Sequence, residues 1–451
     1  MRNISLAEIA EAVGGELPFG GEELVVTAGV STDTRSLSGG EFFVALRGDN
    51  FDGHNYIDSA LDAGAIGALV DEATDGCVGQ VVVPDSLLGL QRLARWWREE
   101  LAIPVVGLTG SNGKTSTKDF TRAVLSQRFQ VRATVGNLNN HIGVPLSVLA
   151  LTEDDEVGVF EMGMNHSGEI APLCEIALPH LGIITNIGSA HIEHMGTRDA
   201  IAEEKGALAR SLPEIGSLIV PASCEYLEYF RDRTKAQVIA VGNGRGEVRA
   251  EEIDGSGDGM KFTLVFDEGG RVPVELSVAG RHMVTNALLA AAVGRRLGLS
   301  IEEVATGLAA TELTSGRLRS FQDRDITVLD DTYNANPESM RAGIDTLSER
   351  QVGEGGRHFA VLGMMAEIGV TAPQEHRSLG VYAAERDVEV VTVGAEAKEI
   401  SEGAGGDRHF DSRDEAATWL SEELKAGDVV LFKGSRMAAV EQVMKQIFPK
   451  N

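Results

Sequence analysis

A short segment in the first third of the chain combines residue types that bind phosphate. Residues 107–120 read GLTGSNGKTSTKDF and directly follow the apolar run IPVV at 103–106. Glycines let successive backbone N–H groups turn inward, and a helix that begins behind them favours an anion. A lysine can reach the terminal phosphates, and a hydroxyl can coordinate Mg²⁺. Gly110, Gly113, Lys114 and Thr115 supply these groups, so the segment predicts a site for the phosphates of ATP or GTP with Mg²⁺.

The segment departs from the usual GxxxxGK[ST] pattern at one position, where Leu108 replaces the first glycine. An ordinary glycine-rich turn between a strand and a helix is the alternative. By itself the loop indicates a nucleotide and identifies no reaction.

The elements around the loop must supply a buried strand before it and a helix after it. From residue 103 to about 300, near-continuous apolar runs alternate with helical segments, as in a parallel sheet covered on both faces. Alternation within 260–278 predicts an antiparallel hairpin appended to this sheet. The expected strands are 103–110, 156–163, 181–188, 217–221 and 237–242, and the expected helices are 114–127 and 283–298.

Two further units flank this region. The first has short β-branched strands at 24–30, 41–46, 65–70 and 80–84 with a helix at 55–64, and a connecting helix follows at 86–101. The last has strands at 326–331, 357–363, 388–394 and 428–434. We predict an α/β fold of three domains: a small N-terminal α/β domain (1–85), a central P-loop ATPase-like domain (86–320) and a C-terminal Rossmann-like domain (321–451). The last domain has no GxGxxG motif, which leaves dinucleotide binding without support.

Length and composition limit the class of protein. A chain of 451 residues is too long for one core, and 40 basic against 68 acidic residues give a net charge of −28. That charge argues against binding to nucleic acid or to an anionic membrane surface. Three widely spaced cysteines exclude a disulfide framework and fit a reducing cytoplasm. We find neither a signal peptide nor an apolar run of ~18 residues, and expect a cytoplasmic protein without membrane insertion.

Several motifs in order carry a family resemblance. TGSNGKTS resembles the loop of the Mur ligases and their relative folylpolyglutamate synthase, ATP-dependent enzymes that couple a carboxylate to an amine. The sequences of the matching motifs most resemble those of the family member that adds D-alanyl-D-alanine to UDP-N-acetylmuramoyl-tripeptide. This implies those two substrates, an acyl-phosphate intermediate, release of ADP and phosphate, and a role in peptidoglycan precursor synthesis. The matching segments are 31–37, 48–57, 136–149, 160–170, 185–196, 203–208, 281–291, 315–318, 330–340 and 431–436.

The resemblance implies catalytic roles for Lys114, Glu161, His191 and Lys205, with the last three and Thr115 as metal ligands. Taken alone, Glu161 is a strand-end carboxylate that could hold Mg²⁺ or only face solvent. The HIEH segment is not the HExxH zinc motif, and the family has a histidine, near a second Mg²⁺, at the position of His191. Lys205 reads as a solvated helix lysine. Its family counterpart is carbamylated, which turns a cation into an anion and requires a lowered lysine pKa.

The resemblance also implies binding residues. Asn286 is expected at the adenine and Arg317 at the phosphates, whereas Asn336 precedes a proline and could form only a structural turn. For the residues expected at the UDP end of the substrate, the alternative is a simple turn without a ligand. For the basic residues expected at a substrate carboxylate, the alternative is an ordinary basic start of a helix. The expected ATP contacts are Thr109, Gly110, Ser111, Asn112, Gly113, Lys114, Thr115, Ser116, Asn140, Asn286, Arg317, Asp331, Asn334 and Asn336. The expected substrate contacts are Ser31, Arg35 and His54 at the UDP end, and Lys433 and Arg436 at the carboxylate.

Other functions stay open at this stage. The ligase that adds the third peptide residue is the nearest alternative, although the Asp-Asn-Pro-Arg motif usual for its diamino-acid-adding form does not occur here. A folylpolyglutamate synthase is a weaker alternative, because nothing in the first 85 residues is expected of that enzyme. An alternative from a different functional class is a non-enzymatic P-loop switch, which binds a nucleotide to change its affinity for a partner. We expect a monomer.

Overall fold

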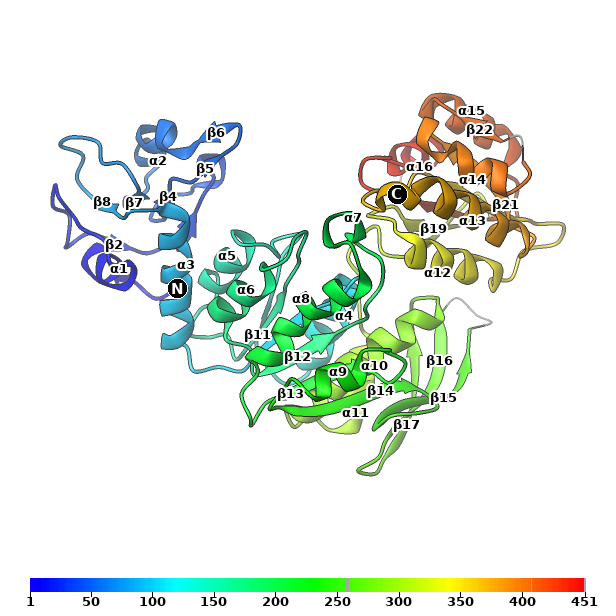
Figure 1. Cartoon of the computed structure of the whole chain (residues 1–451), viewed down its shortest axis with the longest axis horizontal. Coiled ribbons are helices and arrows are strands. Elements are labelled where there is room, and N and C mark those ends of the chain that lie inside the picture. The colour runs from blue at the N-terminus through cyan, green and yellow to red at the C-terminus, as the bar shows by residue number, and fades with distance from the viewer. Residues whose placement is uncertain (256–258, 407, 450–451) are drawn as a thin grey trace.

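The computed structural model describes residues 1–255, 259–406 and 408–449, and it contains three α/β units in chain order (Figure 1). The N-terminal and C-terminal units lie on opposite sides of the central unit in this view. The predicted α/β architecture with three units is therefore confirmed.

The N-terminal unit is built on a four-stranded parallel sheet. Its strands, in spatial order, are β3 (Val30–Ser31), β4 (Phe42–Val44), β7 (Gly67–Val70) and β8 (Gln80–Val82), with α1 (Leu6–Val13) and α2 (Ile57–Asp62) beside them. The single strand predicted at 24–30 is wrong. β2 (Val25–Val26) pairs antiparallel with β1 (Ile4–Ser5), and β3 begins only at Val30. Between them, the N–H groups of Thr27 and Ala28 both donate to the carbonyl of Gly40, which interrupts the strand.

Helix α3 (Ser86–Glu100) connects the first unit to the second, as predicted. Its apolar face packs into a core shared by α1 of the first unit and by α5 (Gly143–Leu149) and α6 (Ile170–Ala177) of the second. Arg98, only 3% exposed, donates from this helix to the carbonyls of Ala177 (2.9 Å), Leu101 (2.5 Å) and Ile103 (2.8 Å). These bonds join the ends of two helices to the chain entering the central sheet.

The central unit has a nine-stranded sheet with β9 (Val105–Thr109) between β11 (Val157–Glu161) and β12 (Leu181–Ile184). Helices α4 (Lys114–Leu125) and α10 (Arg281–Arg296) cover one face, while α5, α6 and α8 (Arg198–Ser211) cover the other. The remaining strands are β10 (Val131–Ala133), β13 (Ser217–Pro221), β14 (Gln237–Asn243), β15 (Val248–Asp254), β16 (Met260–Phe266) and β17 (Arg271–Leu276). The predicted antiparallel pair is confirmed in β16 and β17. Strand β15 was not expected, because its sequence VRAEEID has no apolar run.

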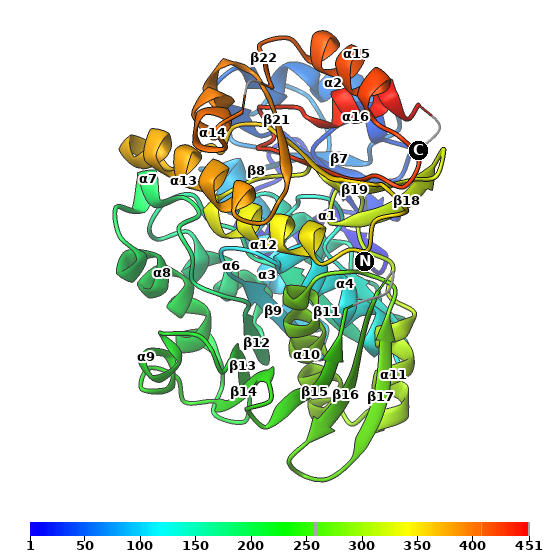
Figure 2. The same cartoon turned by 90° about the vertical axis from the view of Figure 1, so that its right-hand side faces the viewer.

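The C-terminal unit is a Rossmann-like sheet, as predicted. Its order is β18 (Arg319–Asp323), β19 (Ile326–Asp331), β23 (Val429–Lys433), β20 (His358–Leu362), β21 (Glu389–Val393) and β22 (His409–Phe410), with only β18 antiparallel. Helices α12 (Pro337–Ser348) and α13 (Ala372–Ala384) follow β19 and β20. Figure 2 shows this unit above the central one, with α12 on the side facing it.

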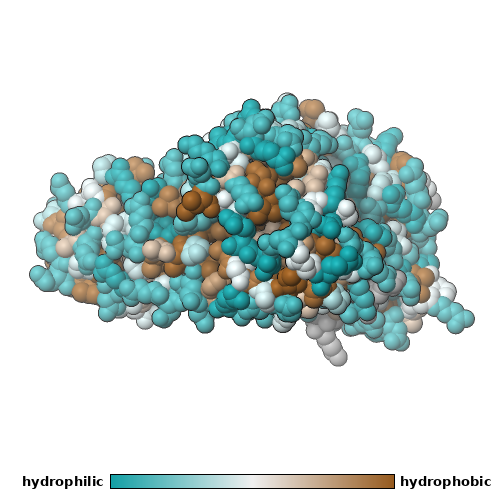
Figure 3. Space-filling view, turned by 90° about the horizontal axis from the view of Figure 1, so that it is seen from below, coloured by the Kyte–Doolittle hydropathy of each residue, from teal (hydrophilic) through white to brown (hydrophobic). Residues whose placement is uncertain are grey.

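Figure 3 and the lengths of the helices bear on contact with a membrane. Hydrophilic residues cover most of the face shown in Figure 3, with apolar residues scattered among them. Within the part of the chain that the structure describes, no helix combines the length and apolar character needed to cross a bilayer.

Candidate active site

The phosphate loop predicted from the sequence connects β9 to α4. Gly110 has φ +150°, and a Cβ atom there would overlap Oγ1 of Thr185 and lie 3.0 Å from Cβ of Thr185. Lys114 begins α4, and its Nζ donates to the carbonyl of Gly110 at 2.7 Å. Leu108, which stands where the usual pattern has a glycine, lies within β9 and is fully buried in the core. The loop proper therefore begins only at Gly110, and the departure from the pattern belongs to the strand.

The strand order places Glu161 beside this loop. Since β11 neighbours β9 in parallel, Glu161 at its end lies next to the residues that follow Thr109. Oγ1 of Thr115 donates to Oε2 of Glu161 at 3.0 Å, and Nδ2 of Asn139 donates to Oε1 at 2.9 Å. The carboxylate is 3% exposed, and its backbone N–H is bound by Oγ1 of Thr134. Asn139 was missed by the sequence reasoning, which chose the adjacent Asn140.

The donor atoms at this point suit Mg²⁺. A hydroxyl and a carboxylate are hard oxygen ligands, and Mg²⁺ is usually held by one or two such groups together with phosphates and water. Among the described residues, no three His, Cys, Asp or Glu side chains gather as a complete metal cage. Thr115 and Glu161 therefore fit a Mg²⁺ ion that arrives with a nucleotide.

Three basic side chains, those of Lys114, His191 and Lys205, lie close enough at the phosphate loop to influence one another's charge. Lys205 lies on α8 with 1% of its surface exposed, and burial together with the charge of Lys114 lowers its pKa well below the usual lysine value. Burial also lowers the pKa of Lys114, with Arg317 adding to the effect and Glu161 opposing it. Burial and the charges of Lys114 and Lys205 lower the pKa of His191, while Glu367, whose Oε2 lies 2.6 Å from Nδ1 of His191, opposes the shift. The solvated alternative for Lys205 is therefore wrong, and the neutral amine that carbamylation requires is favoured by burial.

The loop after β12 contacts the phosphate loop. The N–H of Asn112 donates to Oδ1 of Asn186 at 2.9 Å, and Oγ1 of Thr185 donates to the carbonyl of Asn112 at 2.5 Å. Oγ of Ser111 accepts from the N–H of Gly188 at 2.9 Å. The same loop continues into His191, so the conformation of the phosphate loop and the place of the histidine depend on each other.

The C-terminal unit and the segment that leads into it, which includes Arg317, supply the opposite wall. Nη2 of Arg317 donates to Oγ1 of Thr115 at 3.3 Å, and its guanidinium stacks 3.9 Å from the ring centre of Tyr333. Nδ2 of Asn336 donates to Oδ1 of Asn112 at 2.7 Å. Nζ of Lys433 lies 2.5 Å from Oδ2 of Asp331, because the ends of β19 and β23 are in register. Side chains of this unit thus reach the phosphate loop directly.

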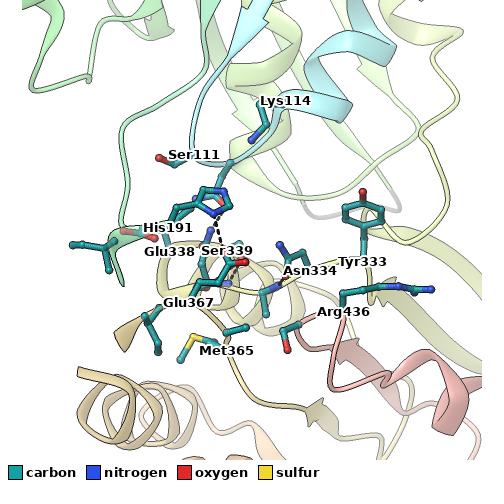
Figure 4. Close-up of a pocket in the computed structure, with 18 of the residues that line it drawn as sticks. Ser111, Lys114, His191, Tyr333, Asn334, Glu338, Ser339, Met365, Glu367 and Arg436 are labelled. Atoms are coloured by element: carbon teal, nitrogen blue, oxygen red, sulfur yellow. Dashed lines mark hydrogen bonds and ion pairs between the residues drawn. The ribbon is translucent and has the colours of Figure 1, made fainter. Parts of the chain in front are cut away.

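A cleft of about 1440 Å³ opens between the two walls (Figure 4). Most of the predicted ATP and metal residues line it, on both sides. The lining includes Ser111, Asn112, Gly113, Lys114, Ser116, Asn140, Glu161, His191, Asn286, Arg317, Asp331, Asn334, Asn336, Lys433 and Arg436. Gly110 in the loop, Thr115 in the first turn of α4 and Lys205 on α8 are not among the residues that line the cleft.

Several predicted residues have structural partners instead of free polar atoms. Oγ1 of Thr109 donates to the carbonyl of Met162 within the sheet. Oδ1 of Asn140 accepts from the N–H groups of Ile142 and Gly143 at the start of α5. Asn336 caps α12 through its Oδ1, as the structural alternative proposed, while its Nδ2 faces the phosphate loop.

The predicted contacts with the UDP end lie in the N-terminal unit, away from the cleft lining. Arg35 is exposed and paired with Asp33, and Oγ of Ser31 donates to the carbonyl of Asp33. His54 has both ring nitrogens engaged: Nδ1 lies 2.7 Å from Oδ1 of Asp52, and Nε2 accepts from the N–H of Asp71. A ligand contact at His54 would require that network to open. These three residues stay predictions.

A P-loop unit whose phosphate site is completed by a Rossmann-like unit defines a nucleotide-binding protein of the multidomain ligase type. Models of three Mur ligase domains match the chain: the family's catalytic domain at 27–87, the middle domain at 108–294 and the glutamate ligase domain at 316–436. The chain belongs to the Mur ligase family.

Full-length relatives agree with this assignment. UDP-N-acetylmuramoyl-tripeptide–D-alanyl-D-alanine ligase from Bacillus subtilis is 36% identical, and the match covers 98% of both chains. A crystal structure of MurF from Acinetobacter baumannii superposes with a TM-score of 0.92 at 33% identity over 100% of both chains. MurF from Thermotoga maritima in complex with ADP gives a TM-score of 0.85 at 29% identity, covering 94% of this chain and 98% of that one.

Proposed function

We propose that this protein joins D-alanyl-D-alanine to the terminal carboxylate of UDP-N-acetylmuramoyl-tripeptide, with conversion of ATP to ADP and phosphate, in peptidoglycan precursor synthesis. The choice of substrates rests on full-length relatives that carry that name at 36% identity. The chemistry rests on one observation of this chain: the phosphate loop, Thr115 and Glu161 face side chains of a second unit across a single cleft.

The proposed reaction has two steps. A carboxylate oxygen of the tripeptide attacks the γ-phosphorus of ATP, and the bond to the β-phosphate oxygen breaks, giving an acyl phosphate and ADP. The amine of D-alanyl-D-alanine then attacks the acyl carbon, and phosphate leaves as the amide forms. The first step requires two anions to approach each other, so the site must supply positive charge where the phosphoryl group is transferred.

The residues around the loop have distinct tasks in this proposal. The backbone N–H groups of 110–115 and the Lys114 ammonium hold the phosphates, and Lys114 leaves its bond to the Gly110 carbonyl to do so. Thr115 and Glu161 would hold a Mg²⁺ ion, and His191 with carbamylated Lys205 would hold a second one. These ions supply charge neutralisation between carboxylate and phosphate. Burial of Lys205 supports the carbamylation, because it favours the neutral amine.

Residues of the central unit and of the second wall complete the ATP site, and the second wall receives the amine substrate. Asn286, packed against Gly113, is proposed at the adenine, and Arg317 at the phosphates. The C-terminal residues Asp331, Asn334 and Asn336 are proposed to close over the nucleotide. Both cations have a carboxylate partner: Lys433 is buried against Asp331, while Arg436 bonds Glu441 at 3.1 Å but keeps 74% of its side chain exposed, and we propose Arg436 as the more accessible cation for the dipeptide carboxylate. Closure of this wall excludes the water that would hydrolyse the acyl phosphate.

The location and working unit are also proposals. ATP and a UDP-linked precursor are substrates of the cytoplasm, and we place the reaction there. We also propose a monomer as the working unit.

Release of ADP in the presence of UDP-N-acetylmuramoyl-tripeptide and different amines tests this function. D-Alanyl-D-alanine should support turnover, while free D-alanine, lysine and diaminopimelate should not. A Lys114→Ala variant with an unchanged circular dichroism spectrum should lose turnover. Turnover with UDP-N-acetylmuramoyl-dipeptide and a free diamino acid would indicate the ligase that adds the third residue. Nucleotide binding without any amine-dependent turnover would indicate a switch.

A further inference from the structure

The first turn of α12 reaches across the cleft to the central unit through Glu338. Oε1 of Glu338 accepts from the backbone N–H of Ser189 at 2.9 Å, and Oε2 accepts from Oγ of Ser189 at 3.0 Å. The carboxylate thus binds one residue of the other unit through both of its oxygens. Glu338 lines the same cleft as Ser111 and His191 (Figure 4).

The same helical turn makes a second contact with the central unit. Asn336, the N-cap of α12, donates to the side chain of Asn112 in the phosphate loop at 2.7 Å. Ser111 in turn accepts from the N–H of Gly188, the residue before Ser189. The start of α12, the phosphate loop and the segment 186–191 therefore form one hydrogen-bonded network that spans the two units.

The segment held by Glu338 carries a residue proposed to act in catalysis. His191 follows Ser189 by two residues, and its backbone has φ +64°, a conformation that is unfavourable for a residue other than glycine. Such a conformation persists only where surrounding contacts impose it. On the N-terminal side of His191, the contacts of Ser189 with Glu338 and of Gly188 with Ser111 fix this segment. The ring of His191 itself contacts the C-terminal unit, with Nδ1 2.6 Å from Oε2 of Glu367 (Figure 4).

We propose that Glu338 is a positioning residue: its two bonds to Ser189 form when the C-terminal unit closes and hold the segment 186–191 so that His191 faces the phosphate site. The catalytic site is thereby assembled only in the closed arrangement. The proposal rests on the proposed ligase function for its kinetic consequence, while its structural consequence can be measured without any turnover.

Three variants separate this role from a general loss of stability. Glu338→Ala removes both acceptors. Glu338→Gln can keep both contacts with one acceptor, because its amide oxygen can accept from the Ser189 N–H and its amide nitrogen can donate to Oγ of Ser189. Glu399→Ala is the matched control, since Glu399 also binds through its carboxylate, at 2.6 Å from Arg377, but within the C-terminal unit.

Hydrogen exchange of the full chain gives the structural readout. We expect Glu338→Ala to speed amide exchange in the peptide that covers 186–191 by about tenfold, the ratio equivalent to 1.4 kcal/mol. Glu338→Gln should restore slow exchange, and Glu399→Ala should leave this peptide unchanged. Equal exchange of 186–191 in the Glu338→Ala variant and in the unmodified protein would overturn the proposal.

Steady-state kinetics give the functional readout. We expect kcat of Glu338→Ala to fall by about the same factor of ten, while the dissociation constant of ADP stays within about twofold. A loss of kcat with unchanged exchange would place the effect of Glu338 elsewhere and would also overturn the positioning role. If the unmodified protein itself shows no ligation, the proposed function fails, but the exchange result still decides whether Glu338 holds the segment.

Discussion

Replacement of Gly110 by alanine tests whether the backbone of the phosphate loop forms the nucleotide site. At Gly110 the chain has φ +150°, and a new Cβ would meet Thr185 at its Oγ1, Cβ and N atoms. All three atoms belong to the neighbouring strand end, where the backbone N–H of Thr185 donates to the carbonyl of Thr109. The loop can relieve this conflict only by moving away from β12.

The cost of the substitution has two parts. An unfavourable backbone conformation costs about 1–3 kcal/mol for a residue with a side chain. Rotation of Thr185 to avoid the new methyl group breaks its 2.5 Å bond to the Asn112 carbonyl, a further loss of about 0.5–1.5 kcal/mol. Together these terms predict that Gly110→Ala weakens ADP binding by between about tenfold and a thousandfold.

Isothermal titration of ADP with Mg²⁺ measures this change directly. Gly244→Ala is the control, because Gly244 has φ +69° but has open space around it in a turn distant from the cleft. The control should lose a little stability and retain ADP affinity. The reasoning is refuted if Gly110→Ala folds and binds ADP as tightly as the unmodified protein, or if both variants lose the same affinity.

Three other substitutions test separate parts of the site and the scaffold. Lys205→Ala should abolish ligation, and a short carboxylate added to the buffer should restore part of it; no restoration at any concentration would argue against a carbamylated lysine. Glu161→Gln should raise the Mg²⁺ concentration needed for half-maximal turnover by at least about tenfold, the lower end of what a lost supporting carboxylate costs; an unchanged Mg²⁺ titration would remove Glu161 from the metal site. Arg98→Met removes the guanidinium bonds to four carbonyls and should lower the free energy of unfolding by about 2–4 kcal/mol. Urea unfolding followed by the fluorescence of the buried Trp97 measures that change, and an unaltered midpoint would contradict the role given to Arg98.

The parts of the fold that the sequence could predict are those with local signals. Apolar runs mark the buried strands β9, β11 and β12, and the glycines with Lys114 mark the loop that joins β9 to α4. Parallel pairing then places Glu161 beside the loop, because strands that are adjacent end at the same edge of a sheet.

The parts that could not be predicted depend on contacts between distant segments. The choice of Asn139 over Asn140 depends on how the loop before α5 folds over β11. Burial of Lys205 arises from packing around a helix whose sequence reads as solvated. Glu338 meets Ser189 only because two units that are separate in sequence lie against each other, and no local pattern indicates that contact.

The most direct test of the account follows oxygen atoms through the reaction. The tripeptide substrate is prepared with ¹⁸O in both oxygens of its terminal carboxylate and is incubated with ATP, Mg²⁺ and D-alanyl-D-alanine. An acyl-phosphate route transfers one of these oxygens to the phosphate and leaves the other in the new amide. We predict one ¹⁸O atom in each phosphate released with product, measured by mass spectrometry, whereas product formation with unlabelled phosphate would contradict activation of the carboxylate by ATP in this cleft.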